Sequence, residues 1–161
     1  MIYFSLNPSS SKEKCGLPAV SYAMSDKDFT DVVNSIRKQD SRFDKGAYYF
    51  IRQALDHTLK HIKEDQSGNN HHVSGKELLE GIKEYALDQY GPMTKTLLDA
   101  WNIKRCRDFG DIVFHLVDAG VLGKTENDSP EDFAGGYNFR EAFESPFLPP
   151  SKKEGPDHSH N

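Results

Sequence analysis

Cysteine is nearly absent from this chain. Cys15 and Cys106 are the only two among 161 residues, and they belong to no CxxC or Cys/His pattern. Domains that depend on disulfides have many cysteines, and structural zinc sites have closely spaced cysteine or histidine pairs. The sequence therefore predicts neither a disulfide framework nor a structural zinc site, and it favours a reducing compartment.

Long hydrophobic runs are missing as well. No apolar stretch approaches the ~20 residues that a membrane-spanning helix needs. Residues 1–6 are apolar, but they are too few for the core of a signal peptide, no lysine or arginine precedes them, and Pro8 follows. We therefore expect a cytoplasmic protein that does not enter a membrane.

Positive charge is in short supply. The chain has 20 lysines and arginines against 25 aspartates and glutamates, so its formal net charge is −5. Proteins that bind nucleic acid without sequence preference are usually basic, because they must attract phosphates. The charge balance favours another protein as the partner and makes nucleic acid the less expected one.

The chain length suits one domain with two tails, because each further domain would need a core of its own. Residues 7–24 mix Ser, Lys, Pro and Gly without an apolar period, and residues 145–161 are richer still in Pro, Ser, Lys and His. We expect a flexible N-terminal segment over 1–24, a helical domain over 25–144 and a disordered tail over 145–161.

Apolar residues recur at helical spacing in five segments of the central region. The first predicted helix runs from the cap residue Ser25 to about Gln39, and the second, central helix begins after Asp44. The third has the strongest start signal, a capping box formed by Ser74 and Glu77. These signals predict where three helices begin.

Two further helices follow. Gly91 is expected to end the third helix, and Pro92 suits the first turn of the fourth. The fifth is predicted to start at an Asp108 cap and to stop at Gly120. The fourth and fifth segments thus predict a helix, a turn and a second helix.

The residues after this helix pair allow two interpretations. Segments 121–125 and 136–139 flank an Asn-Asp-Ser-Pro turn and could pair as a β-hairpin, which would make the region 74–140 winged-helix-like. A loop that packs Phe133, Tyr137 and Phe143 onto the helices would use the same residues. The predicted fold class is mainly α, a helical domain with a small β-hairpin and a winged-helix-like C-terminal half.

Several blocks of the sequence are similar to a known protein family. They are HVSGKELLEGIKEYALDQYGPM, DFGDIVFHLVDAGVLGKTENDSPEDF and GYNFREAF, together with the upstream FDKGAYYFIRQALDHTL. They resemble an uncharacterised bacterial family described mainly from Planctomycetes and Verrucomicrobia. The resemblance covers about residues 26–144. It implies a bacterial protein, but no activity, cofactor or catalytic residue, and we expect no cofactor.

DNA binding is the first functional hypothesis, because winged-helix domains place the second helix of the pair in the major groove. The outward residues expected on the fifth helix, Asp111, His115 and Asp118, would repel phosphates and read no bases. The segment 124–144 carries two cations against six anions. A DNA-binding transcriptional regulator is thus an alternative. It would use the basic residues of the turn before the fifth helix, together with other basic residues assembled in three dimensions: Lys104, Arg105 and Arg107 form the local cluster.

A metal-dependent enzyme is a further alternative. His57 and His61 lie one helical turn apart on the second predicted helix, and two such imidazoles can bind one transition metal. The HExxH pattern of metalloproteases needs a glutamate directly after the first histidine, whereas Thr58 follows here. No third ligand is fixed by spacing, so a solvated polar face is the favoured interpretation.

A protein-binding surface is the hypothesis we favour. Phe114 lies beside His115 and off the apolar stripe of the fifth helix, where it could anchor a partner or hold the wing against the helices. The acidic segment that follows could steer a basic protein surface toward it. We predict a non-enzymatic protein-interaction or regulatory module without catalytic residues. The predicted partner-binding residues are Phe114, His115, Asp118, Glu131 and Asp132.

Overall fold

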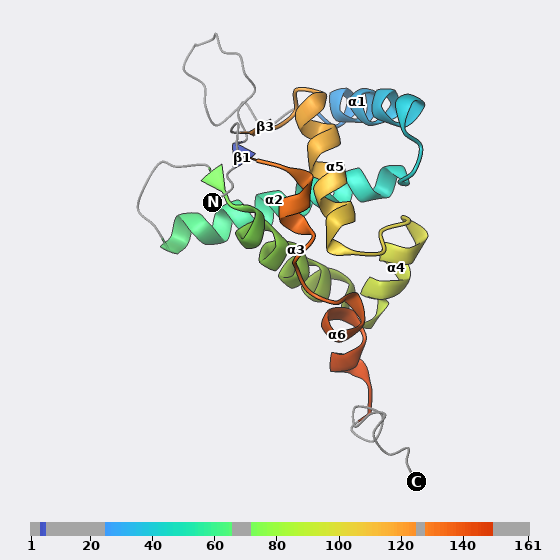
Figure 1. The fold of residues 1–161 in the computed structure, drawn as a ribbon, viewed down its shortest axis with the longest axis vertical. Coiled ribbons are helices and arrows are strands. Elements are labelled where there is room, and N and C mark those ends of the chain that lie inside the picture. The colour runs from blue at the N-terminus through green and yellow to red at the C-terminus, as the bar shows by residue number, and fades with distance from the viewer. Residues whose placement is uncertain (1–3, 6–24, 66–71, 125–127, 150–161) are drawn as a thin grey trace.

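The computed structural model describes residues 4–5, 25–65, 72–124 and 128–149 (Figure 1). Over these ranges the protein is mainly helical, as predicted, and none of the helices is long and apolar enough to cross a membrane. The helices are α1 (Asp26–Gln39), α2 (Lys45–Asp65), α3 (Gly75–Tyr90), α4 (Thr94–Ala100), α5 (Cys106–Asp118) and α6 (Phe139–Phe143). Three 3₁₀ helices accompany them: η3 (Gly91–Met93), η4 (Pro130–Phe133) and η5 (Ser145–Phe147).

Helices α1 and α3 begin at the predicted cap residues. The Ser25 hydroxyl accepts a hydrogen bond from the Asp28 N–H at 3.1 Å. Ser74 and Glu77 form the predicted capping box, with the Glu77 N–H donating to the Ser74 hydroxyl and the Ser74 N–H donating to the Glu77 carboxylate. These bonds satisfy backbone donors that the first helical turn leaves without partners.

Helix α5 begins earlier than predicted. It starts at Cys106, so the predicted cap residue Asp108 is the third helical residue. Its buried carboxylate reaches back and accepts hydrogen bonds from the backbone N–H groups of Lys104 at 2.8 Å and Arg105 at 3.2 Å. The carboxylate therefore still closes the N-terminus, but from inside the helix. At the other end Gly120 has a φ of 81°, which ends the helix as predicted.

The strands also pair differently from the prediction. β3 (Gly123–Lys124) pairs antiparallel with β1 (Phe4–Ser5), which pairs on its other side with β2 (His72–Val73). The order in this small sheet is β2-β1-β3. Two residues of the predicted flexible N-terminal segment therefore form the central strand, and residues 1–3, 6–24 and 125–127 lie outside the described residues.

The prediction of a second hairpin strand over residues 136–139 is wrong. Residues 136–138 form no strand, and Phe139 begins α6. The alternative loop is what the structure contains: Phe133 and Phe143 are fully buried, and the Tyr137 hydroxyl donates a hydrogen bond to the Leu79 carbonyl at 2.9 Å. A buried ring removes about 150–250 Å² from water, which outweighs a pairing of two short strands.

The predicted C-terminal tail also begins later than expected. Residues 145–147 form η5, which follows α6 directly and packs against it. Residues 148 and 149 are also described, and residues 150–161 of that tail lie outside the described residues. The boundary of the helical domain therefore lies beyond the predicted residue 144.

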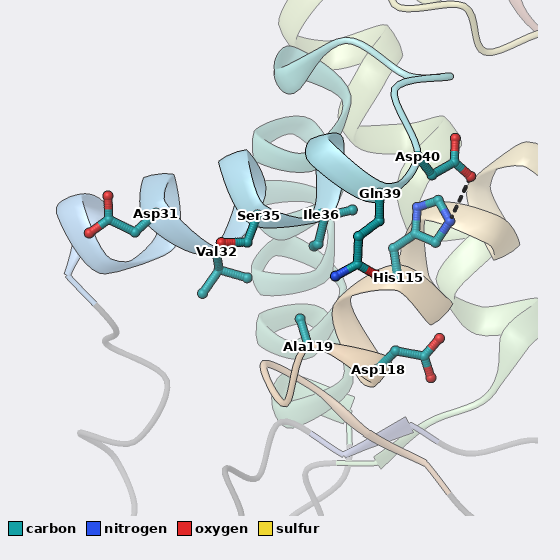
Figure 2. Close-up of a pocket in the computed structure, with 9 residues that line it drawn as sticks. All are labelled: Asp31, Val32, Ser35, Ile36, Gln39, Asp40, His115, Asp118 and Ala119. Atoms are coloured by element: carbon teal, nitrogen blue, oxygen red, sulfur yellow. Dashed lines mark ion pairs between the residues drawn. The ribbon is translucent and has the colours of Figure 1, made fainter.

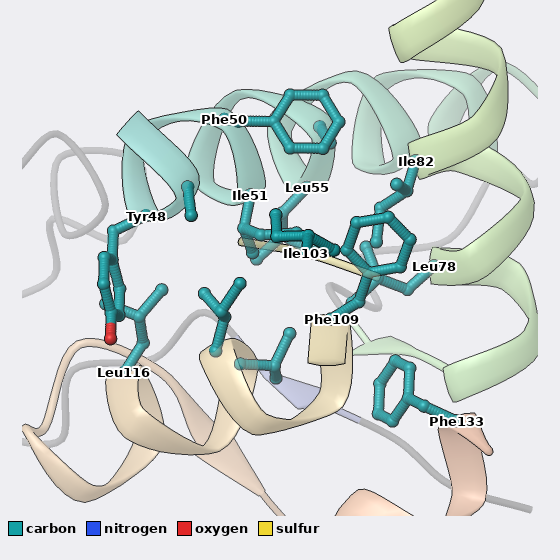
Figure 3. Packing of buried hydrophobic residues seen from close by; sticks show 14 of the residues in the cluster. Tyr48, Phe50, Ile51, Leu55, Leu78, Ile82, Ile103, Phe109, Leu116 and Phe133 are labelled. Carbon is teal, nitrogen blue, oxygen red and sulfur yellow. The ribbon is translucent and has the colours of Figure 1, made fainter. Parts of the chain in front are cut away.

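Helix α2 is the centre of the core, as its apolar period predicts. Helices α1, α3 and α5 all contact it. Figure 3 shows Ile51 and Leu55 of α2 pointing toward Ile103 and Phe109, with Leu78 of α3 beside them. All five side chains are buried, so the same helix fixes the positions of its neighbours.

Helices α2 and α3 approach each other closely at a glycine. A Cβ atom on Gly81 would lie 1.8 Å from Oγ1 and 2.8 Å from Cβ of Thr58. The Thr58 hydroxyl is itself held, because it donates a hydrogen bond to the Ala54 carbonyl at 2.7 Å. The two helices can pack at this spacing only because Gly81 has no side chain.

Gly81→Ala should therefore destabilise the protein by about 1–3 kcal/mol, the usual cost of inserting atoms into a packed core. Alanine is otherwise the better helix former by about 1 kcal/mol, so a net loss would report the clash. Urea unfolding monitored by circular dichroism measures the effect. Gly135→Ala is the control, since a Cβ there meets no atom within 4 Å; equal stability of both variants would contradict the close approach.

Candidate functional site

A groove of about 650 Å³ lies between α1 and the C-terminal end of α5 (Figure 2). This volume is within the range of about 300–1,000 Å³ that is usual for ligand sites. Figure 1 shows the reason for its position: α1 lies across the C-terminal end of α5. The nine residues that line it are Asp31, Val32, Ser35, Ile36, Gln39, Asp40, His115, Asp118 and Ala119.

The lining combines an apolar part with a polar rim. Phe29 and Val33 of α1 are buried, and their side of the helix faces the core. Asp31, Ser35 and Gln39, spaced four residues apart, are exposed on the same helix and line the groove. The apolar part of the lining consists of Val32, Ile36 and Ala119.

The groove is negatively charged. Its nine lining residues include three aspartates and no lysine or arginine. Asp40 is paired, with its carboxylate 3.3 Å from Nε2 of His115 and 3.6 Å from the Arg42 guanidinium. The Asp31 and Asp118 side chains have no ion pair or hydrogen bond with any other residue that the structure describes. These two carboxylates are available to a cation from outside.

His115 is fixed between two helices and does not point freely outward. Its Nδ1 atom is hydrogen-bonded to the Tyr48 hydroxyl at 2.9 Å, and its Nε2 atom lies next to Asp40 (Figure 2). Tyr48 is fully buried, and this burial raises the pKa of its phenol to about 12. The contacts tie the groove wall on α5 to α2 and to the end of α1.

A row of alternating charges continues from this point along α5. Arg42 reaches Asp111 at 3.2 Å, Arg107 reaches Asp111 at 3.1 Å, and Arg107 also reaches Glu131 at 3.0 Å. Asp111, predicted to face outward, is only 13% exposed because two arginines cover it. Single surface ion pairs stabilise little, but such a connected network also fixes the direction of the side chains.

Of the five predicted partner-binding residues, two line the groove. His115 and Asp118 belong to its α5 side. Phe114 does not: it is half-buried and packs against the hydrophobic core. Phe114 is therefore partly covered by the protein's own core, and its role as an anchor for a partner stays a prediction. His115 and Asp118 lie in the groove at the end of α5.

The other two predicted residues lie away from the groove and have local roles. The Asp132 carboxylate accepts a hydrogen bond from the Ser129 N–H at 2.9 Å and so caps η4. The Glu131 carboxylate accepts a hydrogen bond from the Ser129 hydroxyl and forms an ion pair with Arg107. These contacts hold the pKa of Glu131 below its usual value. Neither acidic residue lines the groove.

The cations of the predicted basic cluster are paired with carboxylates. Lys104 lies 3.1 Å from Asp99, and Arg105 lies 3.7 Å from Asp108. Arg107 is shared between two acidic residues, as described above. Hydrogen bonds from lysines hold the pKa of Asp99 below its usual value. Each cation of the predicted cluster therefore already has an acidic partner.

The histidines of α2 are close together but lack further ligands. The His57 and His61 rings are 4.3 Å apart, and Nε2 of His57 is buried 4.0 Å from the Glu84 carboxylate. No group of three or more histidine, cysteine, aspartate or glutamate side chains within the described ranges could hold a metal ion. A structural zinc site needs four ligands and a catalytic one usually three.

The α1 side of the groove was not predicted from the sequence. Asp31, Ser35 and Gln39 recur every four residues and mark a polar stripe on α1, which was the available signal. The stripe alone does not show that the end of α5 lies opposite. Asp40 was missed for the same reason, because its partner His115 is far away along the chain.

Comparison of the chain with protein-family models, with curated proteins and with solved structures gives no match. The resemblance to the bacterial family therefore stays a prediction. The function proposed below rests on the geometry and charge of the groove.

Tyr48→Phe should lower the free energy of unfolding by about 1 kcal/mol at pH 7, because it removes the hydrogen bond to His115. Above pH 10 the difference in free energy of unfolding between the two proteins should shrink, and then the variant should become the more stable one. An unfolded chain releases the tyrosine proton near pH 10, whereas the native state keeps it to about pH 12. The wild type therefore loses up to about 2.7 kcal/mol over this window, and the variant does not.

Urea unfolding of both proteins at pH 7, 9, 10 and 11 measures this difference. The other tyrosines titrate in both proteins, so their effects cancel. A stability difference that stays constant from pH 7 to pH 11 would contradict the elevated pKa of Tyr48.

Proposed function

We propose that the protein is a non-enzymatic protein-interaction or regulatory module of a bacterial cytoplasm, and that the groove between α1 and α5 is its binding surface. The observation that carries this proposal is a groove with an apolar part and two carboxylates that no described residue pairs. Protein-binding surfaces commonly combine an apolar centre with a polar rim.

The arrangement around His115 supports binding more than catalysis. A general base must reach a proton of a substrate or nucleophile, whereas the ring nitrogens of His115 face the buried Tyr48 hydroxyl and the Asp40 carboxylate. Tyr48 is fully buried, and its pKa of about 12 keeps it protonated at neutral pH, so it is a poor nucleophile. In this proposal the Tyr48, His115 and Asp40 side chains shape the groove.

The pairing of charges supports a protein partner over DNA. A DNA-binding surface gains affinity by releasing counterions when free lysines and arginines neutralise phosphates. Lys104, Arg105 and Arg107 would first have to leave their carboxylate partners. The groove itself would repel phosphates because of Asp31 and Asp118.

Ser35→Trp tests the groove as the binding surface. Ser35 is an exposed lining residue, so an indole ring there should fill the groove without entering the core. We expect proteins that the wild type captures from native lysate to be lost with this variant, as judged by mass spectrometry.

Asn34→Trp is the matched control. Asn34 is the exposed neighbour on α1 and does not line the groove, so this variant should capture the same proteins as the wild type. Circular dichroism verifies that both variants fold. Capture that is unchanged by Ser35→Trp would contradict the groove as the binding surface.

A further inference from the structure

The two ends of the groove on α1 are marked by carboxylates. Asp31 lies on α1, and Asp40 is the residue that caps its C-terminal end (Figure 2). At a rise of 1.5 Å per residue, the nine-residue separation corresponds to about 13 Å along the helix. Asp118 adds a third carboxylate from the facing helix α5. Asp40 is already paired with His115 and Arg42, so Asp118, one turn beyond His115 on α5, is the carboxylate available at that end. A ligand that contacts both ends therefore needs two positive charges roughly this far apart.

The span of about 13 Å sets the length of a segment that reaches both ends. An extended chain covers it with four residues at about 3.3 Å each, whereas an α-helix needs nine at 1.5 Å each. An extended segment is therefore the shortest one that reaches both ends of the groove.

Alternation along an extended chain then fixes the pattern of side chains. The side chains of residues i, i+2 and i+4 point to the same side of an extended segment. Cationic side chains at i and i+4 then reach the two ends of the groove, and the side chain at i+2 contacts its middle. The middle of the groove offers the apolar side chains of Val32, Ile36 and Ala119. Lysine and arginine suit the ends, because their aliphatic stems can lie on apolar surface while their charges reach carboxylates.

We propose that the groove binds a short extended segment of a partner protein with lysine or arginine at positions i and i+4 and an apolar residue at i+2. This inference rests on the proposed function, since it names the chemistry of the partner for the same groove. Charge complementarity with Asp31 and Asp118 selects a basic segment and rejects an acidic one.

Labelled synthetic peptides test the pattern by fluorescence anisotropy with the full chain. The peptide GSKSLSKSG carries the proposed spacing and should bind. GSESLSESG, with reversed charge, should bind about tenfold more weakly or not at all. GSKSLKSSG has the same composition but places the second lysine on the opposite side of an extended chain, so its affinity should also fall. Equal binding of all three peptides would overturn the proposal.

Variants of the protein test the assigned carboxylates. Asp31→Asn and Asp118→Asn should each lower the affinity for GSKSLSKSG about twofold to fivefold, as expected for exposed ion pairs. This loss of affinity should be smaller at high salt. Glu144→Gln is the matched control, an exposed carboxylate outside the groove, and should change nothing. The double variant Asp31→Lys/Asp118→Lys should prefer GSESLSESG. Unchanged preference in the double variant would overturn the assignment.

The two proposals fail in different ways. If Ser35→Trp abolishes capture of proteins from lysate but GSKSLSKSG does not bind the wild type, the groove is a binding surface and the basic segment is wrong. If the peptide binds equally to the wild type and to Ser35→Trp, it binds elsewhere and the inference is overturned. If Ser35→Trp changes neither capture nor peptide binding, both proposals fall.

Discussion

The burial of α2 is the constraint on which the rest of the structure depends. Its apolar residues are enclosed by α1, α3 and α5, so each neighbour is placed by its contact with the same helix. The close approach at Gly81 and Thr58 sets the position of α3, and the contact of Phe50 with Phe109, whose rings are 6.3 Å apart, helps to set that of α5. The groove exists because α1 and α5 are both held against α2 in this way.

Polar contacts then determine the character of the groove. His115 joins α5 to the buried hydroxyl of Tyr48 and to Asp40, while the row of alternating charges pairs Arg42 and Arg107 with carboxylates. Asp31 and Asp118 are left without a partner among the described residues. Exposed carboxylates cost little in free energy where they stand in water, so a fold can keep them for recognition.

The C-terminal half shows how tertiary packing decides between two local options. The residues of the predicted wing could pair as strands or pack as a loop, and burial of Phe133 and Phe143 decides for the loop. The strand Gly123–Lys124 still forms, but its partner comes from the start of the chain. An unpaired strand edge can pair with any suitable segment. The residues near the strand do not determine which segment that is.

Local sequence signals predicted the helices α1 to α5, because capping bonds and apolar periods act over a few residues: the Ser25 cap, the capping box at Ser74 and the stop at Gly120 were all predictable. Helix α6 was not predicted, since it begins where a strand was expected. Even the Asp108 signal marked the right helix end, although it acts from the third helical position. Only the tertiary structure decided which faces meet. The groove, its His115 contacts and the central strand join residues far apart along the chain, and such contacts depend on how all the buried surfaces pack together.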